Sequence, residues 1–198
     1  MSLRPAFEIG LWNAWIFMPY LFLIMYAAFK LKKGEEPKNE LEALSKTEKR
    51  IFAFSMLVFL SAVIYSIFLP LKLGTIWFYV GLPITLIGLV AVTIAMANFA
   101  TSPWDEPVTK GLYHYSRHPM YITTFIFLLG VGIASASWLF LLLSIIFTIL
   151  NSRRVIPEER FCLKRYGEAY REYLNRTPKW IGIPKSGEER EIGSSAAG

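Results

Sequence analysis

Charged residues divide this chain into long apolar stretches. No Lys, Arg, Asp or Glu occurs in four segments: Ile9–Phe29, Ile51–Leu71, Leu73–Trp104 and Pro119–Ser152. About 20 consecutive apolar residues of α-helix cross the hydrocarbon core of a bilayer. The pattern therefore predicts an all-α, polytopic membrane protein. In the third segment a helix from about Thr75 to Asn98 is enough for one crossing, because Pro103 and Trp104 follow it.

The fourth segment is too long for one crossing. Its 34 uncharged residues would form a helix roughly 50 Å long, against about 30 Å of hydrocarbon. The alternative is a hairpin of two short, tilted helices that breaks near Gly130–Ser137. Small residues in this region would let the two helices approach closely.

The distribution of cations decides between these alternatives. With a hairpin, 19 of the 21 Lys and Arg residues lie on one side of the membrane and only Arg4 and Lys72 on the other. With a single crossing the division is 9 against 12. Cytoplasmic loops carry the excess of Lys and Arg. We therefore expect five transmembrane helices, the fourth and fifth forming a tight hairpin, with the N-terminus outside and the C-terminus in the cytoplasm.

Composition agrees with a multi-pass membrane protein. Hydrophobic residues make up 54% of the chain and charged residues 18%, against about a quarter charged in soluble domains. We expect one domain over residues 1–185 and a disordered tail over 186–198. The first segment is interpreted as a retained helix, because it is long for a signal peptide and lacks a cleavage pattern. Cys162 is the only cysteine and is interpreted as a small apolar residue on a helix face.

The net charge of +6 has two possible explanations. A basic chain can bind nucleic acid, but these cations flank the apolar segments, where anionic lipid headgroups explain them. We therefore expect membrane lipids as partners and no nucleic acid. No metal site is predicted, and the oligomeric state stays open.

The loop Asp105–Tyr121 is the first segment with candidate chemistry. Pro119 is typical of the first turn of a helix, which places Arg117 and His118 at a helix N-terminus on the membrane face. Such an end presents unpaired N–H groups and suits a carboxylate. The alternative is a polar turn whose Arg and Tyr side chains anchor the membrane interface.

The second segment, Asn151–Arg160, follows the last apolar stretch. Glu158 and Glu159 there can hold the amino group or the ribose hydroxyls of a cofactor, which leaves Arg153 or Arg154 to bind an anion. A solvated interfacial cluster of ion pairs is the alternative.

Residues Phe161–Leu174 then predict an amphipathic helix. Cys162, Tyr166, Tyr170 and Tyr173 recur there at helical spacing, opposite a charged face. The helix is expected to lie in the membrane interface or over a pocket.

These segments resemble a known family. The elements that carry the resemblance are Thr109–Tyr121, Pro157–Glu159, Tyr166–Tyr173 and Thr177–Trp180. Together they are similar to the isoprenylcysteine carboxyl methyltransferase and phospholipid methyltransferase superfamily, over roughly residues 98 to 184. The resemblance implies a pocket for S-adenosylmethionine that is open to the cytoplasm, walled by the fourth and fifth helices and capped by the C-terminal segment.

The resemblance also implies residue roles. Contacts with the cofactor are expected from Gly111, Leu112, Tyr113, His118, Pro119, Tyr121, Glu158 and Glu159. Catalytic groups are expected among Arg117, Arg153, Arg154 and Glu159, and of these the arginines would orient the acceptor or the methionine carboxylate. A lipophilic acceptor would enter from the bilayer, and a prenylcysteine carboxylate, an aminophospholipid headgroup and a small hydrophobic thiol or acid all stay open.

Two other functions share part of this pattern. Membrane sterol and enone reductases that use NADPH have a similar helical core and a similar Tyr-Gly…Tyr ending. A non-catalytic membrane scaffold or lipid-binding protein is the third possibility. The Pro-Glu-Glu run and the short, five-helix length favour the methyltransferase. No Gly-x-Gly-x-x-Gly motif occurs, so the helices and their ends must build the pocket.

Overall fold

The computed structural model describes residues 7–34 and 44–184. They form one 3-10 helix and seven α-helices: η1 (Ala14–Phe17), α1 (Met18–Leu31), α2 (Lys46–Ile67), α3 (Ile76–Thr101), α4 (Leu112–Tyr115), α5 (Pro119–Ala134), α6 (Trp138–Tyr166) and α7 (Glu168–Arg176). Within these two ranges there is no β-strand, only an isolated bridge between Asn13 and Pro70. The all-α prediction is confirmed. The predicted disordered tail, 186–198, lies outside the described residues.

Four helical segments are long and apolar enough to cross a membrane. They are Ala14–Leu31, which joins η1 to α1, and helices α2, α3 and α6. Helix α5 is also apolar but has only 16 residues. Large apolar side chains such as Leu57, Ile87 and Leu142 are more than half exposed on these helices. Such a surface suits lipid, so the chain is a multi-pass integral membrane protein.

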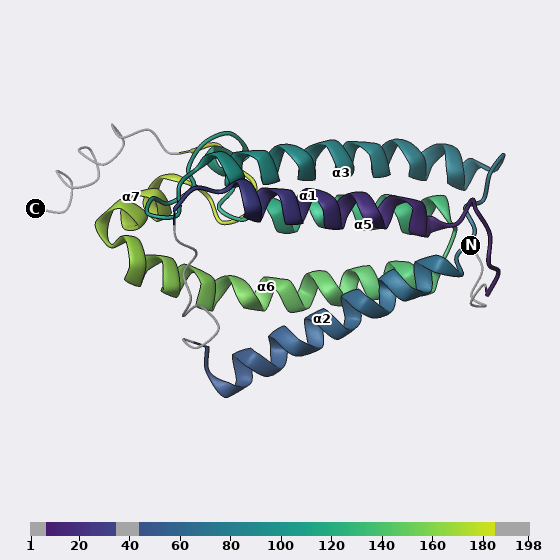
Figure 1. Cartoon of the computed structure of the whole chain (residues 1–198), viewed down its shortest axis with the longest axis horizontal. Helices are drawn as coiled ribbons and strands as arrows, with labels where there is room; N and C mark the ends of the chain where they lie inside the picture. Colours follow the sequence, from purple (N-terminus) through teal and green to yellow (C-terminus); the bar gives the residue numbers. More distant parts are fainter. Residues whose placement is uncertain (1–6, 35–43, 185–198) are drawn as a thin grey trace, which may run out of the picture.

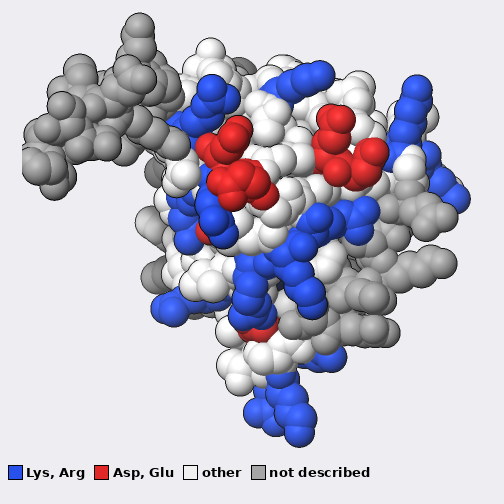
Figure 2. All heavy atoms as spheres, turned by 90° about the vertical axis from the view of Figure 1, so that its left-hand side faces the viewer, with Lys and Arg blue, Asp and Glu red and all other residues white. Residues whose placement is uncertain are grey.

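The helices form an elongated bundle with two distinct ends. Helices α1, α3 and α5 lie along one another, and α2 crosses α6 on the other side of α5 (Figure 1). Helices α4 and α7 lie at one end, which we call the α7 end. The loop that carries Lys72 and the turn after α5 lie at the other end, where the amide of Lys72 donates to the carbonyl of Ala134. Figure 2 looks onto the α7 end and shows Lys and Arg side chains spread over it, with acidic groups among them.

Local sequence explains several helix ends. Pro119 is the first residue of α5, as predicted. Ser45 caps α2 in a reciprocal arrangement with Glu48, in which each side chain binds the other residue's backbone N–H. Ser137 caps α6 by accepting from the amide of Phe140. Each cap satisfies N–H groups that a helix start otherwise leaves without a partner.

The fourth apolar segment is divided, but its glycines do not make the turn. Helix α5 ends at Ala134 and α6 begins at Trp138, so the chain changes direction at Ser135–Ser137. Gly130 lies inside α5 against the backbone of Thr85 of α3, and Gly88 of α3 lies against the backbone of Phe127. A Cβ at either glycine would overlap the facing helix. The small residues therefore serve mainly the contact between α3 and α5, not the contact between the two halves of the segment, although Gly132 does face α6.

The predicted amphipathic helix over Phe161–Leu174 is wrong in its bounds. Helix α6 continues without a break through Pro157 to Tyr166 and is 29 residues long. Gly167 then ends it with a φ of +57°, and the same residue precedes α7. Glycine adopts this backbone conformation without the steric cost that a Cβ imposes. One rigid helix consequently carries both apolar residues and the glutamates beyond them.

Candidate functional site

A cavity of about 610 Å³ opens at the α7 end of the bundle. All seven α-helices contribute to its walls, together with the loop after α3. Of the predicted site residues, six line it: Tyr113, Arg117, Tyr121, Arg153, Arg154 and Glu158. Its volume lies within the range of small-molecule and cofactor sites, which is about 300–1,000 Å³. The structure therefore brings the two predicted segments, far apart in sequence, to one cavity.

The two neighbouring glutamates of α6 have different partners. Glu158 lines the cavity, and its Oε2 accepts a hydrogen bond of 2.8 Å from the hydroxyl of Tyr121. Glu159 lies behind it, where Oε1 is 3.1 Å from Nη2 of Arg117 and 3.1 Å from Nε2 of His118. One carboxylate is thus available to a ligand, and the other holds two side chains of the α5 start.

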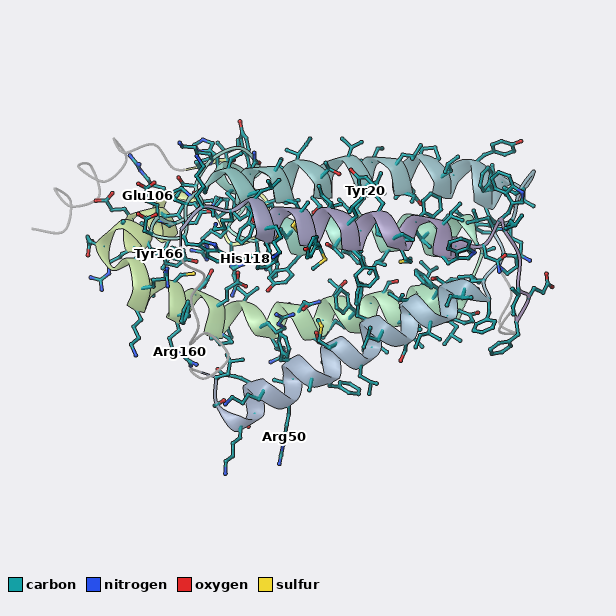
Figure 3. All side chains as sticks on the ribbon, in the orientation of Figure 1. Tyr20, Arg50, Glu106, His118, Arg160 and Tyr166 are labelled. Carbon is teal, nitrogen blue, oxygen red and sulfur yellow. The ribbon has the colours of Figure 1, made fainter. Side chains whose placement is uncertain are left out.

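His118 joins the two carboxylates. It is buried, with 3% of its surface exposed, at the α7 end of the bundle (Figure 3). Because an ionised carboxylate only accepts, Nε2 carries the proton toward Glu159, while Nδ1 lies 3.7 Å from Oε2 of Glu158. The imidazole also stacks on the ring of Tyr121, with centroids 5.7 Å apart. The ring orientation of His118 is therefore fixed from three sides.

Arg117 links the start of α5 to the C-terminal segment. Its Nη1 donates to the carbonyl of Leu174, and its backbone amide donates to the carbonyl of Pro178. Its Nε is buried without a hydrogen-bond partner among the described residues. Trp180 adds a ring contact to His118 at 6.1 Å. The C-terminal segment thus packs against the start of α5.

Tyr113 presents a second buried donor without a partner among the described residues. Its hydroxyl is enclosed, and burial, with a smaller effect of the negative charge of Glu158, raises the pKa of Tyr113 well above its ordinary value. The hydroxyl therefore stays protonated and can donate. The carbonyl of Tyr113 accepts 2.7 Å from the hydroxyl of Tyr173, whose pKa burial also raises. This bond fixes α4 against α7.

Gly111, Leu112 and Pro119 support the site rather than line it. Gly111 has a φ of +62°, and a side chain there would overlap the amide of Asn98. The backbone N–H of Leu112 donates to Oδ1 of Asn98 at 3.0 Å. Pro119 is buried at the first turn of α5. Asn98 was not among the predicted residues, although a lone amide at the end of an apolar helix is a signal that could have identified it.

The two arginines of α6 lie on the same cavity wall but differ in their contacts. Arg154 donates to Oδ1 of Asn151 at 2.9 Å, and its guanidinium carbon lies 4.4 Å from the centre of the Phe52 ring. Arg153 is exposed and lines the cavity. Arg154 is thus held in place, whereas the guanidinium of Arg153 is presented to solvent and the cavity.

Sequence reasoning missed the part of the cavity that α1, α2 and the loop after α3 build. The carbonyl of Trp104 accepts from Nη2 of Arg165 and from the hydroxyl of Tyr166, both at 3.0 Å. Arg160 of α6 reaches both carboxylate oxygens of Glu48 on α2, at 3.0 and 3.1 Å (Figure 3). These contacts join residues 61 to 112 positions apart, so no local pattern predicts them.

Comparison with known proteins identifies relatives over part of the chain. A family model described as phospholipid methyltransferase matches residues 72–169. A protein-S-isoprenylcysteine O-methyltransferase of Schizosaccharomyces pombe is 35% identical over 78 residues, covering 39% of this chain and 32% of the relative. One of the same name from Dictyostelium discoideum is 28% identical over 156 residues, covering 66% of this chain and 60% of the relative. The chain thus matches less than two thirds of the length of either relative.

Proposed function

Because this chain belongs to the isoprenylcysteine carboxyl methyltransferase and phospholipid methyltransferase superfamily, we propose that it transfers a methyl group from S-adenosylmethionine to a lipophilic acceptor. The observation that carries the proposal is the cavity at the α7 end. It presents the carboxylate of Glu158 and four arginines to one space, and two of its lining residues, Tyr113 and Arg117, carry buried donors without described partners.

The residues of the cavity fit this cofactor. Glu158 offers a carboxylate for the amino group or the ribose hydroxyls, and Tyr121 orients it. Tyr113 and Arg117 both line the cavity and each carries a buried donor without a partner among the described residues, and buried donors gain most when a ligand supplies the missing acceptor. His118 and Glu159 act behind this wall as positioning residues, since they fix Tyr121 and Arg117.

The chemistry of the chain in this reaction is alignment. S-adenosylmethionine, when bound, supplies a methyl group on a positively charged sulfur. An acceptor oxygen forms the new bond to the methyl carbon while the carbon–sulfur bond breaks and its electron pair stays on sulfur. A carboxylate acceptor needs no base. An amine acceptor must lose a proton, for which Glu158, the one of the two glutamates that lines the cavity, is the candidate. Positioning of the two reactants alone can contribute about 7–11 kcal/mol.

We also propose how the bundle sits in the membrane. The α7 end, with the cavity, faces the cytoplasm, and the Lys72 loop faces the other side. Helix α5 crosses as the short first arm of a hairpin with α6, which gives five crossings and an external N-terminus. Support comes from the charge on the α7 end and from the turn at Ser135–Ser137. The acceptor then reaches the cavity from the bilayer, and membrane lipids surround the helices.

The test measures methyl transfer directly. Membranes from cells that express the chain are incubated with S-adenosylmethionine carrying tritium in its methyl group, and in parallel with NADPH. We expect tritium in the lipid-extractable fraction and no consumption of NADPH. Membranes with Glu158→Gln are the matched control and should incorporate far less. If the wild type neither incorporates tritium nor binds S-adenosylhomocysteine, the proposal is wrong, and consumption of NADPH would identify a reductase instead.

A further inference from the structure

Lys32 is a buried cation in the cavity that the proposed cofactor contacts do not use. It follows the last residue of α1, has 7% of its surface exposed and lines the cavity. Its Nζ lies 3.8 Å from the centre of the Phe99 ring and 4.7 Å from that of Trp104. Phe29 closes the group with ring contacts to both, at 5.3 and 6.1 Å. The ammonium therefore lies over two aromatic rings, against which the third ring, Phe29, packs; we call this group of rings the box.

The box leaves the ammonium incompletely satisfied. Among residues 7–34 and 44–184, its single hydrogen bond goes to the carbonyl of Phe99 at 3.2 Å, and no carboxylate lies within ion-pairing distance. An ammonium has three donors, so two remain for other acceptors. A buried cation is costly unless an anion pairs with it. Burial indeed lowers the pKa of Lys32 to about 8.

The residues around Lys32 indicate which kind of ligand would supply the anion. Phe29 of α1 and Ile51 and Phe52 of α2 are apolar residues of the same cavity. The carboxylate of Glu158 belongs to α6, in the segment that matches the methyltransferase family, whereas α1 and α2 precede that segment. Glu48 of α2 also lines the cavity, but its carboxylate is paired with Arg160. The cavity thus places the carboxylate of Glu158 and the ammonium of Lys32 on different helices, with apolar residues of α1 and α2 in the same lining.

We infer that Lys32 binds the anionic group of the lipophilic acceptor, a carboxylate, and so selects an acid over its methylated product. The inference rests on the proposed function, because it assigns the acceptor of the same cavity. Transfer of the methyl group to the carboxylate oxygen turns the anion into a neutral ester, while the sulfonium becomes a neutral thioether. The ester offers Lys32 no charge, so the product binds more weakly than the substrate and leaves.

The test compares the binding of an acid and its ester without any methyl transfer. Full-length protein in nanodiscs, free of cofactor, is titrated with S-farnesyl-N-acetylcysteine and with its methyl ester. We expect the wild type to bind the acid at least about tenfold more tightly, as hydrogen bonds to charged groups allow. Lys32→Met should bring this ratio close to one, and Lys32→Arg should keep most of it because the cation remains. The exposed neighbour Lys33, changed to Met, is the matched control and should leave the ratio unchanged.

Kinetics provide a second measurement. The acceptor carboxylate is fully charged before methyl transfer, so Lys32 pairs with it in the ground state. Lys32→Met should lose this pairing, which raises KM for the acid with little change in kcat. The affinity for S-adenosylmethionine should stay unchanged. The inference is overturned if Lys32→Met keeps the acid-to-ester ratio, if the wild type shows no preference for the acid, or if the variant loses cofactor affinity instead, which would assign Lys32 to the methionine carboxylate.

The inference and the proposed function fail in different ways. If the wild type transfers no methyl group but its preference for the acid depends on Lys32, the role of Lys32 in binding the acid is supported and the proposed methyl transfer is wrong. If methyl transfer proceeds and the preference is independent of Lys32, the activity stands and the inference is wrong. Thermal unfolding of each variant shows whether a loss reflects misfolding, and Lys32→Arg, which retains the charge, tests the inference even if Lys32→Met is unstable.

Discussion

Two adjacent glutamates illustrate how a single helix can assign different tasks to identical side chains. Consecutive residues on an α-helix point about 100° apart, because 3.6 residues complete a turn. Glu158 consequently faces the cavity, and Glu159 faces the start of α5. From the sequence both glutamates are expected to contact the cofactor, with Glu159 also among the catalytic groups, since their spacing alone does not show which face of α6 the cavity occupies.

The difference between the glutamates predicts different effects of neutral variants. Glu158→Gln should weaken S-adenosylmethionine binding by about tenfold or more while changing the melting temperature little. Glu159→Gln should lower both affinity and stability, because Arg117 and His118 lose the negative charge that they share, although the amide keeps one acceptor oxygen. We expect a loss of about 1–3 kcal/mol in the free energy of unfolding. Calorimetric binding and thermal unfolding of both variants check this, and equal melting temperatures would contradict it.

The pKa of Lys32 predicts how acceptor binding depends on pH. Burial depresses this pKa to about 8, with the nearby Cys162 and Arg165 of α6 acting in opposite directions. Because only the charged amine pairs with a carboxylate, affinity for an acid acceptor should be full below pH 7 and decline above pH 8. At pH 9 about a tenth of the amines stay charged, so affinity should fall by about tenfold.

Two controls accompany this pH titration. The methyl ester should bind independently of pH, because it carries no charge for Lys32 to meet. Lys32→Arg should remove the pH dependence, since guanidinium does not titrate in this range. A decline of acid affinity that persists in Lys32→Arg would assign the titration to another group.

At the scale of elements, the contact between α3 and α5 positions the site. Gly81, Gly88 and Gly130 let the two backbones approach closely, and α5 carries His118 and Tyr121 at the end of this contact. Lipid offers no hydrophobic gain for bringing helices together, so close packing of small residues holds them. Any change in the separation of α3 and α5 therefore moves the start of α5 relative to Glu158.

Gly88→Ala should accordingly destabilise the bundle and weaken the site together. The added methyl group would overlap the backbone of Phe127, and overpacking of this kind costs about 1–3 kcal/mol. Leu86→Ala is the matched control on α3, because Leu86 is 47% exposed on the outer surface. Thermal unfolding and S-adenosylmethionine binding measure both effects. If Gly88→Ala and Leu86→Ala behave alike, the close contact is not what positions α5.

The elements also show what the sequence could and could not predict. Apolar length predicted α3 to within three residues at each end and located the other long apolar helices, because lipid demands uninterrupted apolar helix. The division of the fourth segment near Gly130–Ser137 was predicted from its length together with the distribution of cations. The helix that each glycine contacts could not be predicted, because a contact such as that of Gly130 with α3 joins residues more than 40 positions apart. Trp104 and Lys32 were missed for the same reason, because each acts through tertiary contacts that leave no periodic signal. Asn98 was missed although its lone amide at the end of an apolar helix is a local signal.

At the scale of the whole molecule, one cavity is built from residues inside and outside the family match. Residues 72–169 match the methyltransferase family and carry Arg117, His118 and Glu158. Helices α1 and α2 lie outside this match and add Lys32, Glu48 and apolar walls. Under the proposed function, the methyl donor and the acceptor would therefore contact different helices in part, although Phe99 and Trp104, which face the Lys32 ammonium, belong to the matched region.

The proposed arrangement in the membrane makes a prediction about the two ends of the bundle. With Cys162 replaced by Ala, single cysteines are placed at Lys72, at Trp138 near the start of α6, and at Arg171 on α7. A membrane-impermeant maleimide added to intact cells should label the cysteines at 72 and 138, because the turn after α5 lies beside the Lys72 loop. The cysteine at 171 should react only after the cells are opened. Retained methyl transfer by each variant confirms the native fold.

Labelling of the cysteines at 138 and 171 from the same side would mean that α5 and α6 do not form a transmembrane hairpin. The excess of cations at the α7 end would then need a different explanation.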